Sequence, residues 1–273
     1  GTHVAQKFMN FVPDVWYFCA ICVHVWCVYA CGSDSLKHGD DPQYPNLENI
    51  CDIRRSSPPW SSNIFLFEEK KNEQTSLEIY NSLTRFCSSI LDKGIVPAKD
   101  NPNFIGNRVG IFSLMSAIKL SIIKNIKIEE VDFLTGAICG RPKSATFRTA
   151  DIIGLDTLES VAMTTYDKSK DDESIEVFKP PNIIKILIKN NYLGQKSNSG
   201  FYRKNDDGAI QVFNPEKNEY QHVQKLDLGM NQNIIDSENI SDRLNAIINL
   251  DNKYGDFLWH SISDMLLYCA NRV

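Results

Sequence analysis

From residue 99 onward, apolar residues recur at helical spacing, and this pattern constrains the fold of the chain more than any other feature. Four segments read as helices, at residues 103–124, 127–138, 149–170 and 180–194, and a fifth at 254–273. An apolar residue at every third or fourth position places one face of a helix in a core. We therefore expect this part of the chain to be mainly α.

The first helical segment, NPNFIGNRVGIFSLMSAIKLSI at residues 101–122, carries two polar side chains one turn inside an otherwise apolar helix, Asn107 and Arg108. Asn101 can cap this helix, and Pro102 suits the first helical position because no N–H is missed there. An amide is less favourable than Ala in a helix but offers both a donor and an acceptor. Two interpretations of Asn107 remain open: it binds a ligand oxygen, or it ties down the preceding loop.

The guanidinium of Arg108 is expected to form an ion pair with a nearby acid, Asp151 or Asp156. Residues 140–156 also hold three cations that either lie on a solvated loop or contact a phosphate-bearing ligand: Arg141, Lys143 and Arg148. Both alternatives follow from residue types alone.

Upstream, residues 63–98 read as a strand, a helix and a second strand, which is typical of the end of an α/β unit. Thr75 or Ser76 can cap the helix. One helical face gathers the apolar side chains Leu77, Tyr80, Leu83, Phe86 and Ile90.

The first 63 residues differ in composition and residue patterning from the rest of the chain. Residues 15–32 contain no Asp, Glu, Lys or Arg, at the lower length limit for a membrane helix. Residues 32–63 are rich in Ser, Pro, Asp and Asn and read as loop. Residues 1–63 are therefore foreign to the domain that follows, a membrane anchor, or a packed element. A zinc site is disfavoured because apolar spacers separate its candidate ligands, Cys19, Cys22, His24, Cys27 and Cys31.

The net charge of −5 and the scattered cations argue against nucleic-acid binding. Cys87, Cys139 and Cys269 lie far apart, as isolated thiols do in a reducing compartment, so we expect a cytoplasmic protein. The sequence contains no G-x-G-x-x-G, Walker A, H-E-x-x-H or G-x-S-x-G motif. No metal site is expected.

The end of the chain combines a hairpin at residues 199–213, a linker at 219–240 and the last helix. That helix, DFLWHSISDMLLYCANRV, echoes NFIGNRVGIFSLMSAIKL, which suggests the start of a second helical copy. The expected division of the chain is an atypical segment at 1–63, an α/β remnant at 64–98, a helical domain at 99–204, a hairpin and linker at 205–239, and a second copy at 240–273.

Three stretches of the chain resemble the C-terminal domain of 3-hydroxyacyl-CoA dehydrogenases. They read KDNPNFIGNRVG at residues 99–110, EEVDFLTGAICGRPKSATFRTADIIGLDT at 129–157 and NNYLGQKSNSGFY at 190–202. The residues of these stretches are most similar to those of the bacterial proteins in which the dehydrogenase is fused to an enoyl-CoA hydratase. The chain departs from the family pattern at Asn103 and Ser199, where Gly is usual, and at RPKSATFRT.

The resemblance implies a helical domain preceded by a remnant of a Rossmann α/β domain at residues 64–98. It implies that Asn107 contacts the acyl-CoA substrate and that Glu68 matches the family's catalytic Glu. Ser56 stands where the family has its catalytic His. NAD is expected for a full-length member, but this chain has no Gly-rich turn for the pyrophosphate.

Two functions follow from the resemblance. The first is oxidation of 3-hydroxyacyl-CoA to 3-oxoacyl-CoA with NAD in fatty-acid β-oxidation, by an incomplete chain that is inactive alone. The second is a non-catalytic helical module that dimerises or binds acyl-CoA. Both imply an acyl-CoA partner and a homo-oligomer, and membrane contact arises only if residues 15–32 are an anchor.

Overall fold

The structure is a computed structural model that describes residues 52–55, 66–70, 76–90, 94–97, 101–103, 105–224, 235, 237 and 239–272. The chain divides into two compact units, residues 1–106 with 272–273, and residues 107–271. Each unit is described by itself below. Among the described helices, none has the length and apolar character needed to cross a lipid bilayer.

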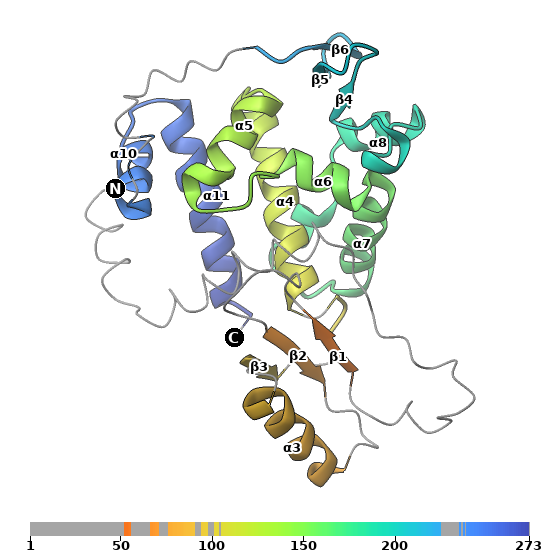
Figure 1. Ribbon diagram of the computed structural model, residues 1–273, viewed down its shortest axis with the longest axis vertical. Helices are drawn as coiled ribbons and strands as arrows, with labels where there is room; N and C mark the ends of the chain where they lie inside the picture. Colours follow the sequence, from red (N-terminus) through yellow and green to blue (C-terminus); the bar gives the residue numbers. More distant parts are fainter. Residues whose placement is uncertain are drawn as a thin grey trace. The chain divides into compact units, whose positions relative to one another are not determined.

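The first unit contains a three-stranded sheet in the order β1-β2-β3, formed by Asp52–Arg55, Leu66–Lys70 and Gly94–Pro97 (Figure 1). β2 and β3 are parallel and are joined through α3, Leu77–Arg85, and the π-helical turn η2, Phe86–Ile90. This confirms the expected strand–helix–strand order. β1 pairs antiparallel with β2, although the sequence analysis placed loop throughout residues 32–63. A four-residue strand with the charged sequence DIRR leaves no apolar alternation to detect.

The amphipathic helix of this unit leaves its apolar face exposed. Ser76 caps α3, because its Oγ accepts a hydrogen bond from the Ile79 N–H. Leu77, Phe86 and Ile90 are 61%, 49% and 70% exposed, whereas Cys87 in η2 is buried. Exposed apolar side chains are a feature of association surfaces.

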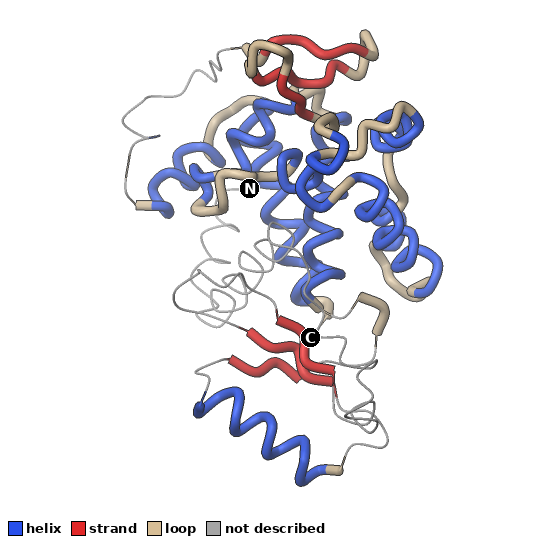
Figure 2. Tube along the Cα trace, turned by 45° about the vertical axis from the view of Figure 1, so that its right-hand side comes forward, coloured by secondary structure: helices blue, strands red, loops and turns tan. Residues whose placement is uncertain are grey.

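The second unit is mainly helical, and Figure 2 shows its three short strands gathered at one end of it. Its α-helices are α4 Gly106–Ile123, α5 Ile128–Thr135, α6 Phe147–Ile153, α7 Leu155–Lys168, α8 Asn182–Lys189, α10 Ile240–Ile248 and α11 Lys253–Ala270. Three 3-10 turns, η3 Ala137–Cys139, η4 Ile175–Phe178 and η5 Gln195–Ser197, lie between them. The structure thus confirms the expected mainly α class.

Helix α4 lies at the centre of the core of this unit. Its side chains Ile111, Leu114, Met115 and Ile118 are almost fully buried. Each such side chain contributes roughly 1.5–3 kcal/mol through removal of apolar surface from water. The other helices of this unit therefore pack around this 18-residue helix.

Helices α4 and α11 run antiparallel side by side, as Figure 1 shows in yellow-green and blue. Near the C-terminal end of α4, Lys124 forms an ion pair with Asp256 in the first turn of α11. Toward the other end, the rings of Phe112 and Tyr268 stack 3.9 Å apart at an interplanar angle of 5°. The last helix of the chain therefore packs along nearly the full length of α4.

Several helix boundaries differ from the sequence analysis: α5 ends at Thr135 and α8 at Lys189, earlier than expected, and two further differences arise from local backbone conformation. The first helix begins at Gly106 rather than near Pro102, since Asn103 has φ 64° and this left-handed conformation cannot start a helix. The expected helix at residues 149–170 is two helices, α6 and α7, because Gly154 adopts φ 93° between them. Both breaks are local backbone conformations favoured by Asn and Gly.

The expected hairpin is present as β4, Tyr202–Lys204, and β5, Ile210–Asn214, joined through Gly208 at φ 80°. A third strand, β6 Glu219–His222, extends this sheet into the segment expected to be a linker. Gly200 precedes β4, and a Cβ there would lie 2.1 Å from the Asp151 Oδ1. Only glycine fits at this close approach between α6 and β4.

Candidate functional site

The two residues implied in catalysis and substrate binding lie in different units. Glu68 is in β2 of the first unit, opposite Arg54 of β1 and Val96 of β3. Asn107 is the second residue of α4, half-buried, at the start of the second unit. Ser56, the candidate zinc ligands and residues 15–32 lie outside the described residues. The first turn of α4 is therefore the part of the candidate site whose surroundings the structure describes.

The residue next to Asn107 is fixed by a buried ion pair. Arg108 Nη2 lies 2.6 Å from Asp172 Oδ2, and the two side chains are 9% and 0% exposed. The expected pairing of Arg108 with Asp151 or Asp156 is therefore wrong. Asp172 lies in the turn between α7 and η4, whose position in space the sequence spacing does not reveal.

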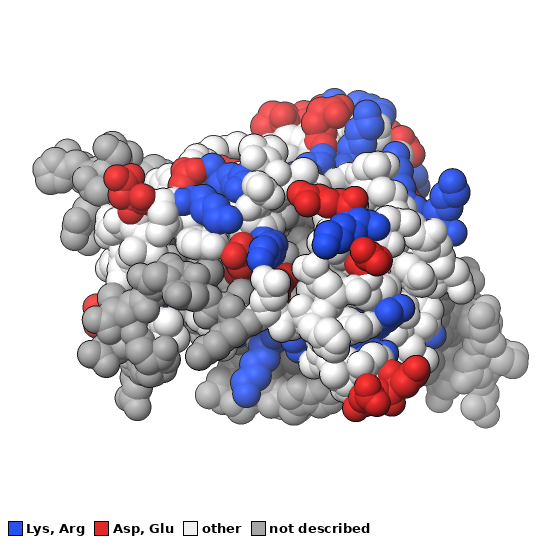
Figure 3. Space-filling view, turned by 90° about the horizontal axis from the view of Figure 1, so that it is seen from above, with Lys and Arg blue, Asp and Glu red and all other residues white. Residues whose placement is uncertain are grey.

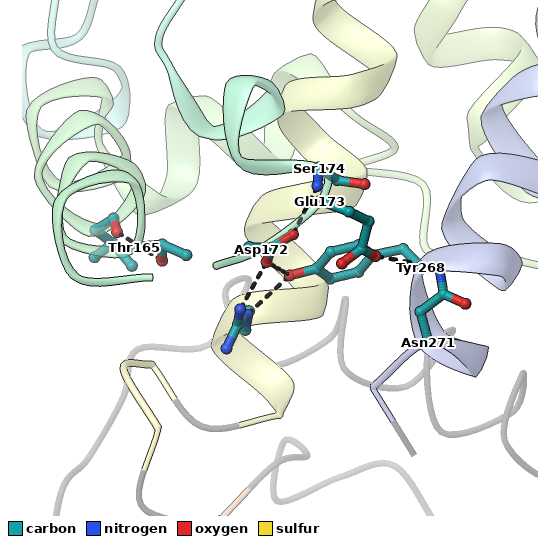
Figure 4. Close-up of polar contacts among 8 residues, drawn as sticks. Thr165, Asp172, Glu173, Ser174, Tyr268 and Asn271 are labelled. Atoms are coloured by element: carbon teal, nitrogen blue, oxygen red, sulfur yellow. Dashed lines mark hydrogen bonds and ion pairs between the residues drawn. The ribbon is translucent and has the colours of Figure 1, made fainter. Parts of the chain in front are cut away.

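Tyr268 of α11 completes this cluster, which we call the Arg108 cluster and define as Arg108, Asp172 and Tyr268. The Arg108 Nε donates to the Tyr268 Oη at 2.8 Å, and the Tyr268 hydroxyl donates to Asp172 Oδ2 at 2.7 Å. Figure 4 shows Asp172, Ser174 and Tyr268 converging on this point. The sequence analysis missed Asp172 and Tyr268, and no motif in the sequence marks them.

The guanidinium of Arg108 stays charged in this buried cluster. Burial by itself would lower the pKa of Arg108, but hydrogen bonds to Asp172 and Tyr268 raise it above its ordinary value. Burial and the hydrogen bond to Asp172 raise the pKa of the Tyr268 phenol. The cluster is thus a guanidinium, a carboxylate and a neutral hydroxyl, in which all the hydrogen bonds described involve a charged group.

The acids first expected to pair with Arg108 have other roles. Asp151 Oδ1 and Oδ2 accept hydrogen bonds from the backbone N–H groups of Phe201 and Tyr202, at 2.8 and 2.9 Å. Asp156 pairs with Lys196 on the surface at 2.5 Å. Asp151 therefore fastens the start of β4 to α6, and Asp156 joins α7 to η5.

The three cations of residues 140–156 do not act together. Arg141 is buried, and its Nη2 lies 3.6 Å from the Met265 Sδ. Lys143 and Arg148 line a cavity of about 540 Å³ that Glu129 and Asp132 also line. The Arg148 guanidinium lies 4.8 Å from the Tyr202 ring centre. Arg243 lines the cavity as well, so three cationic and two acidic side chains share it.

The surface charges in this unit are likewise mixed. On the face shown in Figure 3, Lys and Arg alternate with Asp and Glu. Within the part of the chain that the structure describes, no group of three or more His, Cys, Asp or Glu is placed to hold a metal ion. Among the described residues, Cys87, Cys139 and Cys269 form no disulfide bond, and the first and last of them are buried.

Part of the helical unit is similar to a known family. Residues 104–204 match the family model described as "3-hydroxyacyl-CoA dehydrogenase, C-terminal domain". Asn107, Arg108 and Asp172 all fall within this match, whereas Tyr268 lies beyond it. The family model therefore covers two members of the Arg108 cluster but not the third.

Two named relatives and one solved structure are similar to part of this chain. A "Probable 3-hydroxyacyl-CoA dehydrogenase" of Bacillus subtilis is 36% identical over 198 residues, which are 72% of this chain and 25% of that protein. A "Putative fatty acid oxidation complex trifunctional enzyme" of Rickettsia prowazekii is 26% identical over 72% of this chain and 26% of its own length. A crystal structure of Mycobacterium tuberculosis FadB2 is 28% identical, with a TM-score of 0.44, over 51% of this chain and 47% of that one. This chain thus spans about a quarter of the length of the first two relatives.

Proposed function

We propose that this chain supplies the acyl-CoA side of a 3-hydroxyacyl-CoA dehydrogenase, because residues 104–204 match the model of the 3-hydroxyacyl-CoA dehydrogenase C-terminal domain. In this proposal the reaction is the oxidation of the 3-hydroxyl to a ketone, as in fatty-acid β-oxidation. The observation that carries the proposal is the family match itself, which includes Asn107 in the stretch NPNFIGNR.

The chemistry of Asn107 suits an acyl substrate. Its side chain is half-buried on the first turn of α4, where a helix carries unpaired N–H groups and partial positive charge. The amide can donate a hydrogen bond to a substrate oxygen and accept one from a hydroxyl. A helix N-terminus and an amide donor together favour an oxygen with developing negative charge. The role proposed for Asn107 is to bind and orient the oxygen of the acyl group.

The nicotinamide cofactor of the family does not fit the residues of this chain. The sequence has no G-x-G-x-x-G turn that would let a pyrophosphate approach a helix N-terminus. When bound in a full-length member, NAD accepts the hydride. We derive no step through NAD here, and the contribution of this chain is binding and orientation of the acyl group.

Replacing Asn107 with Ala tests the assigned role. We expect the dissociation constant for 3-hydroxybutyryl-CoA, measured by titration calorimetry, to rise about tenfold through loss of one hydrogen bond. The melting temperature should change by no more than about 2 °C. Asn182→Ala is a matched control, since Asn182 is an exposed Asn in the first turn of α8. A larger loss in melting temperature than in binding would instead support a purely structural amide.

A turnover assay separates the enzyme from the binding module. With 3-hydroxybutyryl-CoA and NAD, the purified 273-residue chain should form no NADH above the rate without protein. The reason is the absence of a Gly-rich phosphate turn and the presence of Ser56 at the position of the family's catalytic His. Steady NADH formation at 340 nm would show that this chain has its own base and cofactor site.

A second candidate function is a non-catalytic helical module that associates with another copy. The observation that favours it is the exposure of the apolar side chains Leu77, Phe86 and Ile90 in α3 and η2. Mass photometry or light scattering would distinguish a dimer from a monomer. Acyl-CoA binding by a dimer that forms no NADH would support both functions together.

A further inference from the structure

We propose that Asp172 and Tyr268 are positioning residues, which act through Arg108 to hold the Asn107 amide in its binding direction. This inference rests on the proposed role of Asn107 and adds to it. The helix α11 that carries Tyr268 lies outside the matched family segment. In this proposal α11 completes the substrate side of the site.

The first link is the covalent neighbourhood of Asn107. Asn107 and Arg108 are consecutive residues in the first turn of α4, so an interaction that fixes the backbone of this turn through Arg108 also fixes the Cα–Cβ direction of Asn107. The guanidinium is planar, and two of its nitrogens are fixed by separate partners, Nε by Tyr268 and Nη2 by Asp172. A planar group held at two points cannot rotate freely, so it sets the rotation of the turn that carries it.

The second link is the rigidity of Asp172. Its Oδ1 accepts a hydrogen bond from the Ser174 N–H at 2.9 Å, and its own N–H donates to the Ser169 carbonyl at 3.0 Å. The carboxylate is therefore anchored in the turn between α7 and η4 before it meets Arg108. Its side chain is fully buried, so water does not compete for these hydrogen bonds.

The third link is the rigidity of Tyr268. Its ring stacks on Phe112 of α4, and the Phe178 ring meets it edge-on with ring centres 6.0 Å apart. The ring thus delivers its hydroxyl to Arg108 and Asp172 from a fixed position. Phe112 is one turn beyond Arg108, so Tyr268 contacts the first part of α4 through both its ring and its hydroxyl.

The functional consequence of the Arg108 cluster is that it fixes the direction of the hydrogen bond from the Asn107 amide to the acyl oxygen. A hydrogen bond weakens steeply when its angle departs from linear, and small displacements of a binding group reduce productive contact. An amide at the start of a helix is prone to fraying of the terminal turn. The Arg108 cluster opposes such fraying, because it holds the residue next to Asn107 in the same turn.

A double-mutant cycle tests this inference on the full chain. The variants are Tyr268→Phe, Asn107→Ala and their combination, and the probes are 3-hydroxybutyryl-CoA and free CoA, which lacks the acyl oxygens. Phe retains the ring stacking and removes only the hydroxyl. We expect Tyr268→Phe to weaken 3-hydroxybutyryl-CoA binding about fivefold and to leave CoA binding within about twofold.

The distinguishing result is the behaviour in the Asn107→Ala background. If Tyr268 acts through Asn107, Tyr268→Phe should there change 3-hydroxybutyryl-CoA binding by less than about 1.5-fold, while its effect on the melting temperature persists. Independent, multiplicative effects on binding, or an equal loss of CoA binding, would overturn the positioning role.

A different result is expected if the proposed function of Asn107, and not the positioning role, is wrong. If Asn107→Ala leaves 3-hydroxybutyryl-CoA binding unchanged, the substrate role of Asn107 is wrong whatever Tyr268→Phe does. If Tyr268→Phe does not fold, Asp172→Glu provides the same cycle, because Glu keeps the counter-charge of the buried Arg108 guanidinium and changes only the position of the carboxylate. Absence of coupling between Asp172→Glu and Asn107→Ala would then contradict the inference.

Discussion

Replacing Asp172 with Ala should lower the unfolding free energy of the helical unit by roughly 3–5 kcal/mol, the largest loss that we expect from a single side chain here. Arg108 and Asp172 are 9% and 0% exposed and lie 2.6 Å apart. Without the carboxylate, the buried guanidinium keeps only the neutral Tyr268 hydroxyl from the Arg108 cluster. A buried charge without a counter-charge costs far more than the net value of the pair, because water no longer solvates it.

Urea unfolding followed by far-UV circular dichroism measures this loss. Asp156→Ala is the matched control, because the Asp156–Lys196 pair is 42% and 46% exposed and its removal should cost less than about 1 kcal/mol. The double variant Arg108→Met/Asp172→Leu should be more stable than Asp172→Ala, since it removes both charges at once. A loss of under 1 kcal/mol for Asp172→Ala would contradict the buried pair.

Local signals in the sequence were sufficient for most helices. The apolar spacing of residues 103–124 predicted α4 to within three residues at its start, and Ser76 capped α3 as expected. The errors occurred where the backbone leaves the common regions, at Asn103 and Gly154. Helical periodicity continues across a single Gly or Asn, so the pattern alone does not reveal a break there.

The partner of Arg108 illustrates the limit of sequence spacing. Asp151 and Asp156 were the nearest plausible acids after the first helices, but the actual partner is Asp172, 64 positions away, and Tyr268 is 160 positions away. Which buried acid meets a buried base depends on how α7 and α11 pack against α4. That packing is set by side-chain volumes over the whole core and not by any local motif.

At the candidate site, Asn107 was predictable from the sequence but its neighbours in space were not. Asn107 drew attention because an amide one turn inside an apolar helix conflicts with local preference, and such conflicts are expected at functional or anchored positions. Its neighbours in space were not predictable, since Asp172 and Tyr268 look like ordinary loop and helix residues. The short strands β1 and β6 were missed for a related reason, because strand pairing depends on a partner.

The stability of the helical unit should fall as the pH rises from about 5 to about 8, because two buried carboxylates hold protons more tightly in the folded state. Burial raises the pKa of Asp132 to about 7, against the opposing effect of backbone hydrogen bonds from Phe147 and Arg148. Burial raises the pKa of Asp151 to about 7 as well, and the charge of Asp132 adds to this. Both groups have pKa values near 3.9 when the chain is unfolded.

The sign follows from proton counting. Between pH 4 and pH 7 the folded state binds more protons than the unfolded state, so unfolding becomes easier as the pH rises. The stabilisation is complete below pH 4 and is lost as the pH passes 7. Each group contributes at most about 1.4 kcal/mol per pH unit in this window. Burial acts to raise the pKa of Asp156, but the hydrogen bonds with Lys196 and the Thr157 N–H, together with the Lys196 charge, lower it overall, so this group titrates below the window and adds no slope there.

Urea unfolding of the wild-type chain and of Asp132→Asn at pH 5.5 and pH 8 measures the effect. The wild type should be more stable at pH 5.5 by at least about 1 kcal/mol, and Asp132→Asn should be less stable overall but with a smaller difference between the two pH values. The overall loss arises because Asn cannot accept all three backbone N–H bonds, from Thr146, Phe147 and Arg148, that Asp132 accepts. Asp156→Asn should keep the wild-type difference. Equal wild-type stability at both pH values would mean that these backbone bonds keep the Asp132 and Asp151 carboxylates ionised despite burial, with folded pKa values close to the unfolded ones.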